Sequence, residues 1–217
     1  MITCCAQGVQ TLRGDSTFPG SVIVTGGSLL LDGATFPIAS RFAGQGKGAF
    51  PAGLGGYGTF GSTTLTTSIL DLAPVNGKFG LARFPFLQLA ADDDVEYEIS
   101  GATPGTGFTQ VVMTGPLILD SARISLSFSG FTPSAGQSLT LIKGATALFD
   151  TFHNAADNKN LAEGGVFTAD GMQFKITFAG GAGHDVVITR QGGAGTPTPT
   201  PGSTKFKSFV PMVARES

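Results

Sequence analysis

The sequence contains no tryptophan, only two cysteines and two histidines, and few charged residues. Asp, Glu, Lys and Arg make up 13% of its 217 residues, which is about half of the roughly 25% usual in soluble domains. The net charge is −2 and no segment concentrates basic residues, so a nucleic-acid partner is not expected. No run of about 18 apolar residues occurs, so no transmembrane helix is expected either. The shortage of reactive side chains favours a structural or adhesive protein over an enzyme.

The N-terminus lacks the pattern of a secretion signal. Met1 is followed by ITCCAQG, which has neither a basic region nor an apolar region of the required length. Because the rest of the chain is typical of an exported protein, we interpret the sequence as a processed or truncated product, or as the downstream part of a longer reading frame. The expected location is extracellular or at the cell surface.

Cys4 and Cys5 are the two cysteines and they are adjacent. Neighbouring cysteines rarely bridge each other, because the ring that would close is strained. They are either two small residues near a frayed chain end, or the source of an intermolecular disulfide in an oxidising compartment. No third or fourth ligand lies nearby in the sequence, so a metal site is not predicted here.

The chain contains many short β-strand patterns. Over residues 97–190, apolar and polar residues alternate in segments that Gly, Pro, Asp or Asn separate. Residues 21–36 predict two short strands and residues 65–99 predict several more. Residues 37–64 are rich in glycine and aromatic residues, which predicts a long loop or several very short strands. Residues 154–163 are the one stretch that allows one or two helical turns, with an extended loop as the alternative.

Two segments resemble each other within the chain. IVTGGSLLLDGATF at 23–36 and VMTGPLILDSARI at 112–124 share Thr-Gly, an apolar stretch, Asp and a small residue. Such similarity favours stacked repeats, as in a solenoid. The 33 glycines and the low charge also suit tightly turned β-structures. We therefore expect an all-β fold at residues 21–191, either a parallel β-helix (β-solenoid) or a β-sandwich-like stack of short strands, after an irregular segment at 1–20.

The C-terminal part of the sequence predicts a linker and a docking segment. Residues 192–203 are rich in Pro, Thr and Gly, which is typical of an extended linker. Residues 204–217 form a short tail with five apolar side chains: Phe206, Phe209, Val210, Met212 and Val213. We expect this tail to dock on its own domain, on a neighbouring subunit or on an export or sorting component. The alternative is a disordered tail with a few apolar residues.

Residues 52–190 resemble the C-terminal part of bacterial autotransporter-like passenger proteins, of the passenger-associated transport repeat or autotransporter-associated β-strand type. The resemblance lies in YEISG at 97–101, GFTPSAGQSLTL at 130–141 and MQFKITFAGGAGHDVVITR at 172–190. It implies a right-handed parallel β-helix, capped or followed by packed β-sheet, outside the cell. It implies no shared catalytic residues.

The densest acidic run is Asp92-Asp93-Asp94, followed by Glu96 and Glu98. A solvated turn is the leading interpretation and a calcium site is the second. A carboxylate pair for polysaccharide cleavage is the third, for which Arg83 and Arg123 are the available basic partners. Residues 180–187 also match one calcium-binding nonapeptide, but such sites need several stacked copies, so a tight hairpin turn is the stronger interpretation.

Three further features of the sequence are weaker indications of function. Arg13-Gly14-Asp15 matches the tripeptide that integrins recognise, and a chance match is the leading interpretation. His153 and His184 each lack a nearby partner and are interpreted as turn or surface residues. Tyr57 and Phe60 are candidates for stacking on sugars, with core or turn packing as the alternative.

Taken together, the sequence predicts an extracellular structural protein that is not an enzyme and needs no cofactor, with calcium as a weak alternative. We expect it to assemble with itself into a filament or layer through strand edges and the docking tail. The alternative is a monomeric adhesin or glycan-binding module that recognises cell-surface polysaccharide. A polysaccharide-cleaving β-helix enzyme is the second alternative.

Overall fold

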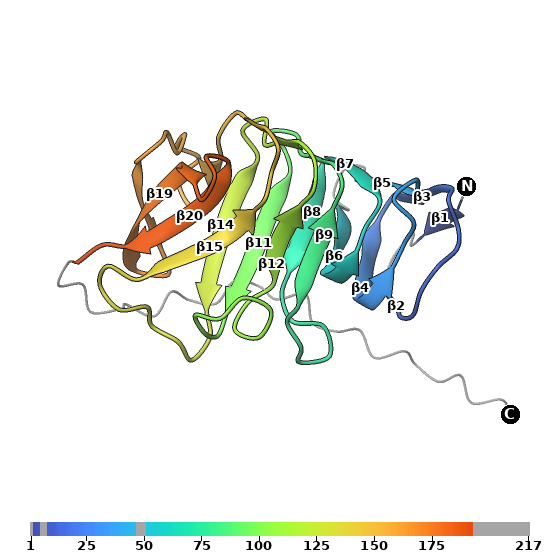
Figure 1. The fold of residues 1–217 in the computed structure, drawn as a ribbon, viewed down its shortest axis with the longest axis horizontal. Coiled ribbons are helices and arrows are strands. Elements are labelled where there is room, and N and C mark those ends of the chain that lie inside the picture. Colours follow the sequence, from blue (N-terminus) through green and yellow to red (C-terminus); the bar gives the residue numbers. More distant parts are fainter. Residues whose placement is uncertain (1, 5–7, 47–50, 193–217) are drawn as a thin grey trace, which may run out of the picture.

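The computed structural model describes residues 2–4, 8–46 and 51–192 (Figure 1). Within these ranges the chain forms strands, turns and bends and no helix, so the expected all-β class is confirmed. No helix there is long and apolar enough to cross a membrane. The expected irregular segment at 1–20 is wrong in part, because Ile2–Cys4 and Val9–Leu12 are both strands. Residues 193–203 of the predicted linker and the whole tail at 204–217 lie outside the described residues.

The strands form two sheets. The first sheet has seven strands: β1 (Ile2–Cys4), β3 (Ser21–Val24), β5 (Arg41–Gln45), β7 (Ser62–Thr66), β10 (Leu87–Gln88), β13 (Leu117–Ile118) and β16 (Leu148–Phe149). The second sheet has thirteen strands: β2 (Val9–Leu12), β4 (Gly27–Thr35), β6 (Ala52–Thr59), β8 (Ser68–Leu72), β9 (Leu81–Phe84), β11 (Asp94–Ile99), β12 (Gln110–Met113), β14 (Arg123–Phe128), β15 (Ser138–Lys143), β17 (His153–Asn154), β18 (Val166–Ala169), β19 (Met172–Gly180) and β20 (Asp185–Arg190).

Nearly all strand pairs are parallel. Each strand pairs in register with the equivalent strand of the next pass of the chain. In the first sheet, Ser21 pairs with Arg41 and Arg41 pairs with Ser62, while Leu117 pairs with Leu148 further along. In-register parallel pairing places each inward side chain directly over its equivalent in the neighbouring strand. The core therefore consists of columns of apolar side chains between the two sheets.

One such column is made of phenylalanine rings. Phe36 packs edge-on against Phe42, Phe42 packs edge-on against Phe60, and Phe60 stacks on Phe84 with ring centroids 4.5 Å apart. All four side chains are buried. Aromatic contacts of this kind add about 0.5–1.5 kcal/mol each to the burial of the rings. Phe60 is thus a core residue, as the packing interpretation of the sequence proposed.

The glycine-rich segment forms longer strands than the sequence suggested. β6 has eight residues and β5 has five, so the expectation of a loop or very short strands at 37–64 is wrong for the part that is described. Gly56 and Gly58 have φ values of 80° and 139°, which bend β6. Its first half pairs with β8 and its end pairs with β9. A Cβ at Gly58 would lie 2.2 Å from the Ala34 carbonyl oxygen, so glycine is required at this corner.

The similarity between residues 23–36 and 112–124 does not mark equivalent positions. Its apolar stretch lies in β4 of the second sheet in the first copy and in β13 of the first sheet in the second copy. Residues 154–163 contain the last residue of β17 (His153–Asn154) and a turn that starts at Asn154, with no helix. The loop alternative for this stretch is therefore confirmed.

The stack ends in antiparallel strands, which belong to the second sheet. β15 pairs antiparallel with β20, β20 with β19, and β19 with β18. Phe174 of β19 stacks on Phe128 of β14, and Phe178 packs against Phe152 next to β17. These contacts place the antiparallel strands over the end of the apolar core, at the opposite end of the molecule from the N-terminus (Figure 1).

β15 pairs parallel with β12 on one side and antiparallel with β20 on the other, and its ladder with β20 has a β-bulge between Thr140 and Ile142. Gln110 Nε2 donates a hydrogen bond of 2.7 Å to the Thr140 carbonyl oxygen, and the Tyr97 hydroxyl donates one of 3.2 Å to the Leu141 carbonyl oxygen. Tyr97 and Gln110 are each only 2% exposed. These two buried side chains therefore satisfy carbonyl groups at the point where the ladder is irregular.

The phenylalanine column predicts where truncation is costly. Phe84→Ala is expected to lower the free energy of unfolding by about 3–5 kcal/mol, because it leaves a cavity under Phe60. Phe149→Ala is the control, since this ring is 55% exposed, and it is expected to change stability by less than about 0.5 kcal/mol. Urea denaturation followed by circular dichroism measures both. Equal losses in the two variants would contradict this description of the core.

The bulge predicts that the two tyrosine hydroxyl groups differ in how much they stabilise the fold. Tyr97→Phe leaves the buried Leu141 carbonyl without its donor and is expected to cost about 1–3 kcal/mol. Tyr57→Phe is the comparison variant, because Asp32, which accepts from the Tyr57 hydroxyl, keeps its hydrogen bonds from Arg13 and Asn76 when that hydroxyl is removed. Denaturant unfolding of both variants tests the point. A Tyr97→Phe variant as stable as the native chain would show that the bulge does not need this hydrogen bond.

Candidate functional site

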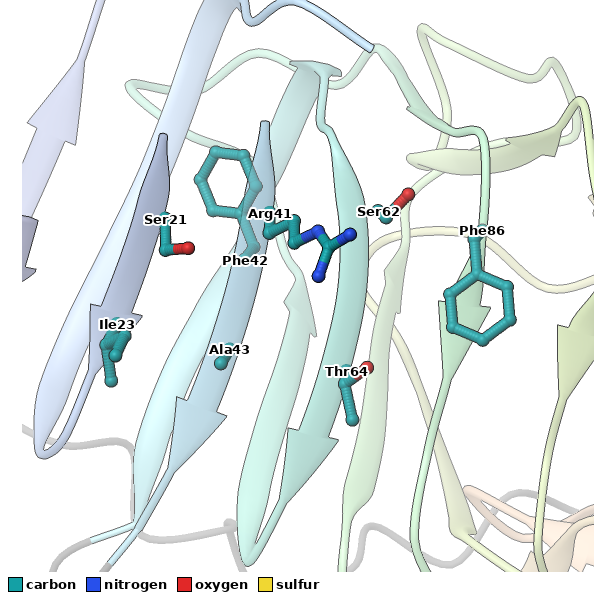
Figure 2. A pocket seen from close by; sticks show the side chains of 8 residues that line it. All are labelled: Ser21, Ile23, Arg41, Phe42, Ala43, Ser62, Thr64 and Phe86. Carbon is teal, nitrogen blue, oxygen red and sulfur yellow. The ribbon is translucent and has the colours of Figure 1, made fainter. Parts of the chain in front are cut away.

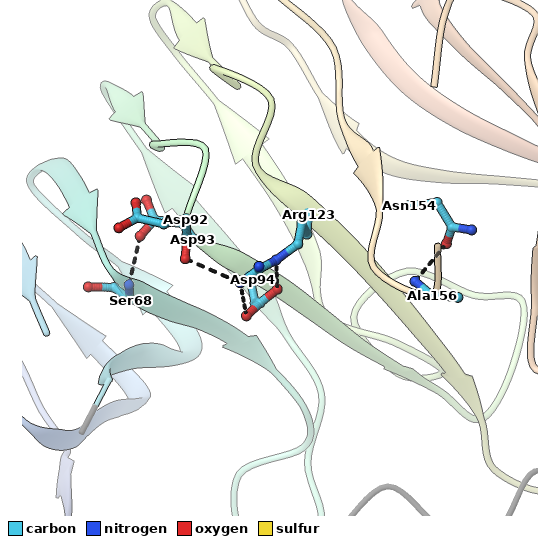
Figure 3. Close-up of polar contacts among 7 residues, drawn as sticks. All are labelled: Ser68, Asp92, Asp93, Asp94, Arg123, Asn154 and Ala156. Atoms are coloured by element: carbon cyan, nitrogen blue, oxygen red, sulfur yellow. Dashed lines mark hydrogen bonds and ion pairs between the residues drawn. The ribbon is translucent and has the colours of Figure 1, made fainter. Parts of the chain in front are cut away.

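The acidic run forms the turn that leads into β11, and its middle residue is buried. Asp93 Oδ1 accepts a hydrogen bond of 2.7 Å from the Ser68 backbone N–H (Figure 3). Asp93 Oδ2 accepts one of 2.7 Å from the Ala90 N–H. The Asp93 side chain is 0% exposed. The interpretation of this run as a solvated turn is therefore wrong for Asp93, which ties its own turn to β8. It holds for Asp92, which is exposed.

Burial raises the pKa of Asp93 to about 6. The two backbone N–H donors oppose this rise, while the neighbouring charges of Asp92 and Asp94 add to it. The carboxyl group is therefore held by the backbone and has no free oxygen directed at solvent. Its position and partners make it a structural residue of the corner.

Asp94 is held by an arginine from the next strand. Arg123 Nε and Nη2 donate to the two carboxylate oxygens of Asp94 over 2.7 Å and 2.8 Å (Figure 3). The two residues are register partners on β11 and β14. Sequence spacing gives no hint of this pair, because the partners lie on successive passes of the chain. Arg83, the other predicted basic partner, lies on β9 in register with Val112 and is not part of this group.

A second pair of carboxylates lies on the outward side of β8 and β11. Asp71 and Glu96 are register partners on these parallel strands. Burial raises the pKa of both, and the charges of Asp71 and Asp94 raise that of Glu96 further. The ion pairs of the described residues involve other carboxylates, so neither Asp71 nor Glu96 has a cation within 4.0 Å there. We call the outward side of β8, β11 and β14 the acidic face.

The acidic face can accept hydrogen bonds from hydroxyl groups or attract a cation. In the part of the chain that the structure describes, however, no three His, Cys, Asp or Glu side chains are grouped as metal ligands. The predicted calcium site at Asp92–Asp94 therefore gains no support from its surroundings, since Asp93 and Asp94 are already bonded to protein groups. The Asp71–Glu96 pair was missed because its members are separated by a full pass of the chain.

A sheet edge is exposed at the N-terminal end. In the described part of the chain, β2 pairs with β4 alone. Ser28 N–H donates to the Gly8 carbonyl, and the alternation of a parallel ladder then directs the N–H and C=O groups of Val9 and Thr11 away from β4. We call this free side of β2 the open edge. Val9 on this strand is 61% exposed.

The core is less covered at the open edge than at the other end. Gln10 and Leu12 are register partners of the buried Leu29 and Leu31 and lie on the same inward side. Gln10 is nevertheless exposed and Leu12 only half-buried. At the opposite end, β18–β20 cover the core with aromatic and aliphatic side chains. The two ends of the stack therefore differ in both backbone pairing and coverage.

Asp32 connects two of the weaker sequence candidates. The Tyr57 hydroxyl donates to Asp32 Oδ1 over 2.5 Å, and Arg13 Nε donates to Asp32 Oδ2 over 2.6 Å. Hydrogen bonds from Tyr57, Arg13 and Asn76 lower the pKa of Asp32 to about 2. Tyr57 therefore uses its hydroxyl within the protein, and Arg13 of the integrin-type tripeptide is engaged in an ion pair.

The remaining candidates are dispersed. Residues 180–187 form the hairpin between β19 and β20, as the hairpin interpretation expected, and Asp185 Oδ1 accepts from the Gly144 N–H. His184 lies in that turn, whereas His153 lies in β17 beside Arg123. Both histidines are partly exposed.

The predicted docking and disulfide residues remain predictions. The five apolar tail residues and Cys5 lie outside the described residues, and Cys4 belongs to β1. Comparisons of this chain with protein-family models, with curated proteins and with solved structures found no match. The resemblance to autotransporter-like passenger proteins therefore rests on the sequence pattern alone.

The buried Asp93 predicts a pH dependence of stability. The folded chain binds this proton up to about pH 6, whereas the unfolded chain releases it near the ordinary value of 3.8. The contribution of Asp93 to stability is therefore present below about pH 4 and is lost as the pH rises to about 6, by at most ~3 kcal/mol. Comparing native chain and Asp93→Asn by denaturant unfolding at several pH values isolates this contribution.

The control is Asp92→Asn. A hydrogen bond from Thr67 lowers the pKa of Asp92, so this carboxyl contributes stability that is lost as the pH falls, which is the opposite direction. Its removal is expected to leave most of the fall between about pH 4 and 6 in place. A native chain and an Asp93→Asn variant with the same pH profile would refute the assignment.

Proposed function

We propose that this protein is an extracellular structural β-helix whose copies join end to end into a filament. The parallel, in-register pairing of both sheets supports the β-helix over the β-sandwich, since sandwiches are built mainly from antiparallel pairs. Each pass of the chain adds one strand to the first sheet and one or two to the second. This order is what stacked repeats of a solenoid produce.

The observation that carries the proposal is the position of the exposed apolar side chains. Among the described residues, four large hydrophobic side chains are exposed: Val9, Ile38, Phe149 and Val166. Three of them lie on strands at the ends of the sheets. Val9 is on β2 at one end, while Phe149 on β16 and Val166 on β18 are at the other. Contact between unlike ends buries side chains from both, and such head-to-tail contacts build filaments when they do not close.

The open edge provides the backbone part of the contact. Soluble proteins protect exposed sheet edges with charged residues, proline or a covering segment. The strand Val9–Leu12 has the sequence VQTL, with neither charge nor proline. Its outward N–H and C=O groups can pair with a strand of a second copy, which satisfies hydrogen bonds and extends the sheet. The closed, aromatic-covered opposite end limits the contact there to side chains and to the short edge strands.

The filament predicts that charge at either end blocks assembly. Thr11→Lys places a charge beside the open edge, and Phe149→Asp places one at the opposite end. Both variants are expected to stay monomeric at concentrations at which the native chain forms polymers. Sedimentation velocity and negative-stain electron microscopy of the full chain measure this. Thr66→Lys is the matched control, because Thr66 is an exposed threonine on β7 inside the stack, and it is expected to polymerise normally.

Each outcome is informative. A native chain that remains monomeric at high concentration overturns the proposal. A dimer that Thr11→Lys abolishes and Phe149→Asp leaves intact shows pairing of two like ends, which also contradicts a filament. Loss of assembly in Thr66→Lys as strong as in the end variants shows that added charge alone, and not its position, is responsible.

A further inference from the structure

The outward side of the first sheet has a shallow groove of about 360 Å³ across β3, β5 and β7 (Figure 2). Ser21, Arg41 and Ser62 are register partners and form one row across these strands. Ile23, Ala43 and Thr64 form a second row, two residues further along. Neighbouring strands lie about 4.8 Å apart, so each row places its three side chains at regular spacing. Because the Ala43 side chain is small, the surface is hollowed at the middle of the second row.

An aromatic side chain bounds the groove on one side. Phe86 precedes β10, and its carbonyl oxygen accepts a hydrogen bond from the Thr63 N–H, which fixes it beside β7. Its partly exposed ring lies next to Ser62 and Thr64 in the close-up (Figure 2). The groove therefore combines an aromatic wall, hydroxyl groups and a cation within one surface.

Arg41 is exposed and belongs to none of the ion pairs formed among the described residues. It is also the one charged side chain on the outward positions of the first sheet, among the strands whose side chains are described. The other outward residues there are uncharged: Ser21, Ile23, Ala43, Gln45, Ser62, Thr64, Thr66, Gln88, Ile118 and Phe149. A planar guanidinium group binds a carboxylate through two parallel hydrogen bonds. The face is thus suited to a ligand with isolated negative charges.

The surroundings of Arg41 narrow the class of ligand. Nucleic acid requires several cations for its closely spaced phosphates, and this face has one. An extended peptide binds sheets by pairing with an edge strand, but the backbone groups of β5 are already paired on both sides. A sugar chain needs only side chains: hydroxyl partners, an aromatic surface for the apolar side of a ring and, when acidic, a cation.

We propose that this groove binds an acidic glycan whose carboxylate pairs with Arg41. Ser21 and Ser62 bond to sugar hydroxyls on either side of the carboxylate, and Phe86 packs against the apolar side of a sugar ring. This site is separate from the open edge and from the acidic face, so it goes beyond the assembly function and does not depend on it. It assigns a polysaccharide surface as the partner of the first sheet.

Isothermal titration calorimetry of the full chain with oligogalacturonate tests the site. Arg41→Gln is expected to weaken binding about tenfold or more, because the carboxylate loses its only cation. Arg41→Lys keeps the charge but loses the paired hydrogen bonds, so it is expected to show an intermediate affinity. Phe86→Leu is expected to weaken binding about fivefold, because leucine stays apolar but lacks the flat aromatic surface that packs against a sugar ring. Arg83→Gln is the matched control, since it removes an exposed arginine from another face, and it is expected to bind like the native chain.

Four results would overturn the proposal. The first is no binding of oligogalacturonate by the native chain, and the second is an equal loss in Arg41→Gln and Arg83→Gln. The third is equally tight binding of neutral dextran or of sulfated dextran, which would remove the preference for a carboxylate. The fourth is tighter binding of poly-glutamate than of oligogalacturonate, which would assign the groove to an acidic peptide.

Discussion

The hydrogen bonds that Tyr97 and Gln110 donate at the β15 bulge hold the point at which the parallel stack stops. A parallel ladder has no intrinsic end, because every added strand leaves a new edge with unpaired groups. Reversal of direction at β20 ends the ladder on one side and brings β18–β20 over the core. β15 has a β-bulge in its ladder with β20, and the Thr140 and Leu141 carbonyl groups there accept hydrogen bonds from the buried Gln110 and Tyr97 side chains. The antiparallel strands that cover this end of the core begin at this junction.

Regular register also determines how charge is distributed. Residues on neighbouring strands lie beside each other although they are far apart in the chain. Each face of the stack therefore has its own charge and polarity. Asp71, Asp94 and Glu96 gather on the acidic face, where Arg123 neutralises one of them. The first sheet collects hydroxyl groups around a single arginine instead. Faces can only offer side chains, whereas the open edge offers backbone groups, so the proposed assembly and the proposed glycan binding use different chemistry.

Much of the fold follows from the sequence, because strand alternation is a local pattern. The two strands at residues 21–36, the hairpin at 180–187 and the all-β class are visible in that alternation. The strand β6 was missed because glycine disfavours strands in general, and here close packing against Ala34 requires it. Burial of Asp93 was missed because a run of three aspartates is usually solvated, and the Ser68 N–H that it binds lies on the preceding pass of the chain. Pairs such as Asp94–Arg123 depend on register, which no local pattern contains.

The strands at the two ends of the stack differ from the inner strands in what their outward side chains can do. Inside the stack, an apolar outward side chain interrupts a surface that is otherwise solvated. Val9, Phe149 and Val166 lie on strands at the ends of the sheets, where the proposed contact would combine burial of apolar area with new backbone hydrogen bonds. Hydrogen bonds alone give little net stabilisation, because water satisfies an exposed edge as well. In the proposed assembly, apolar burial would supply the driving force and the backbone the alignment, and the ends of the stack are where the described chain offers both.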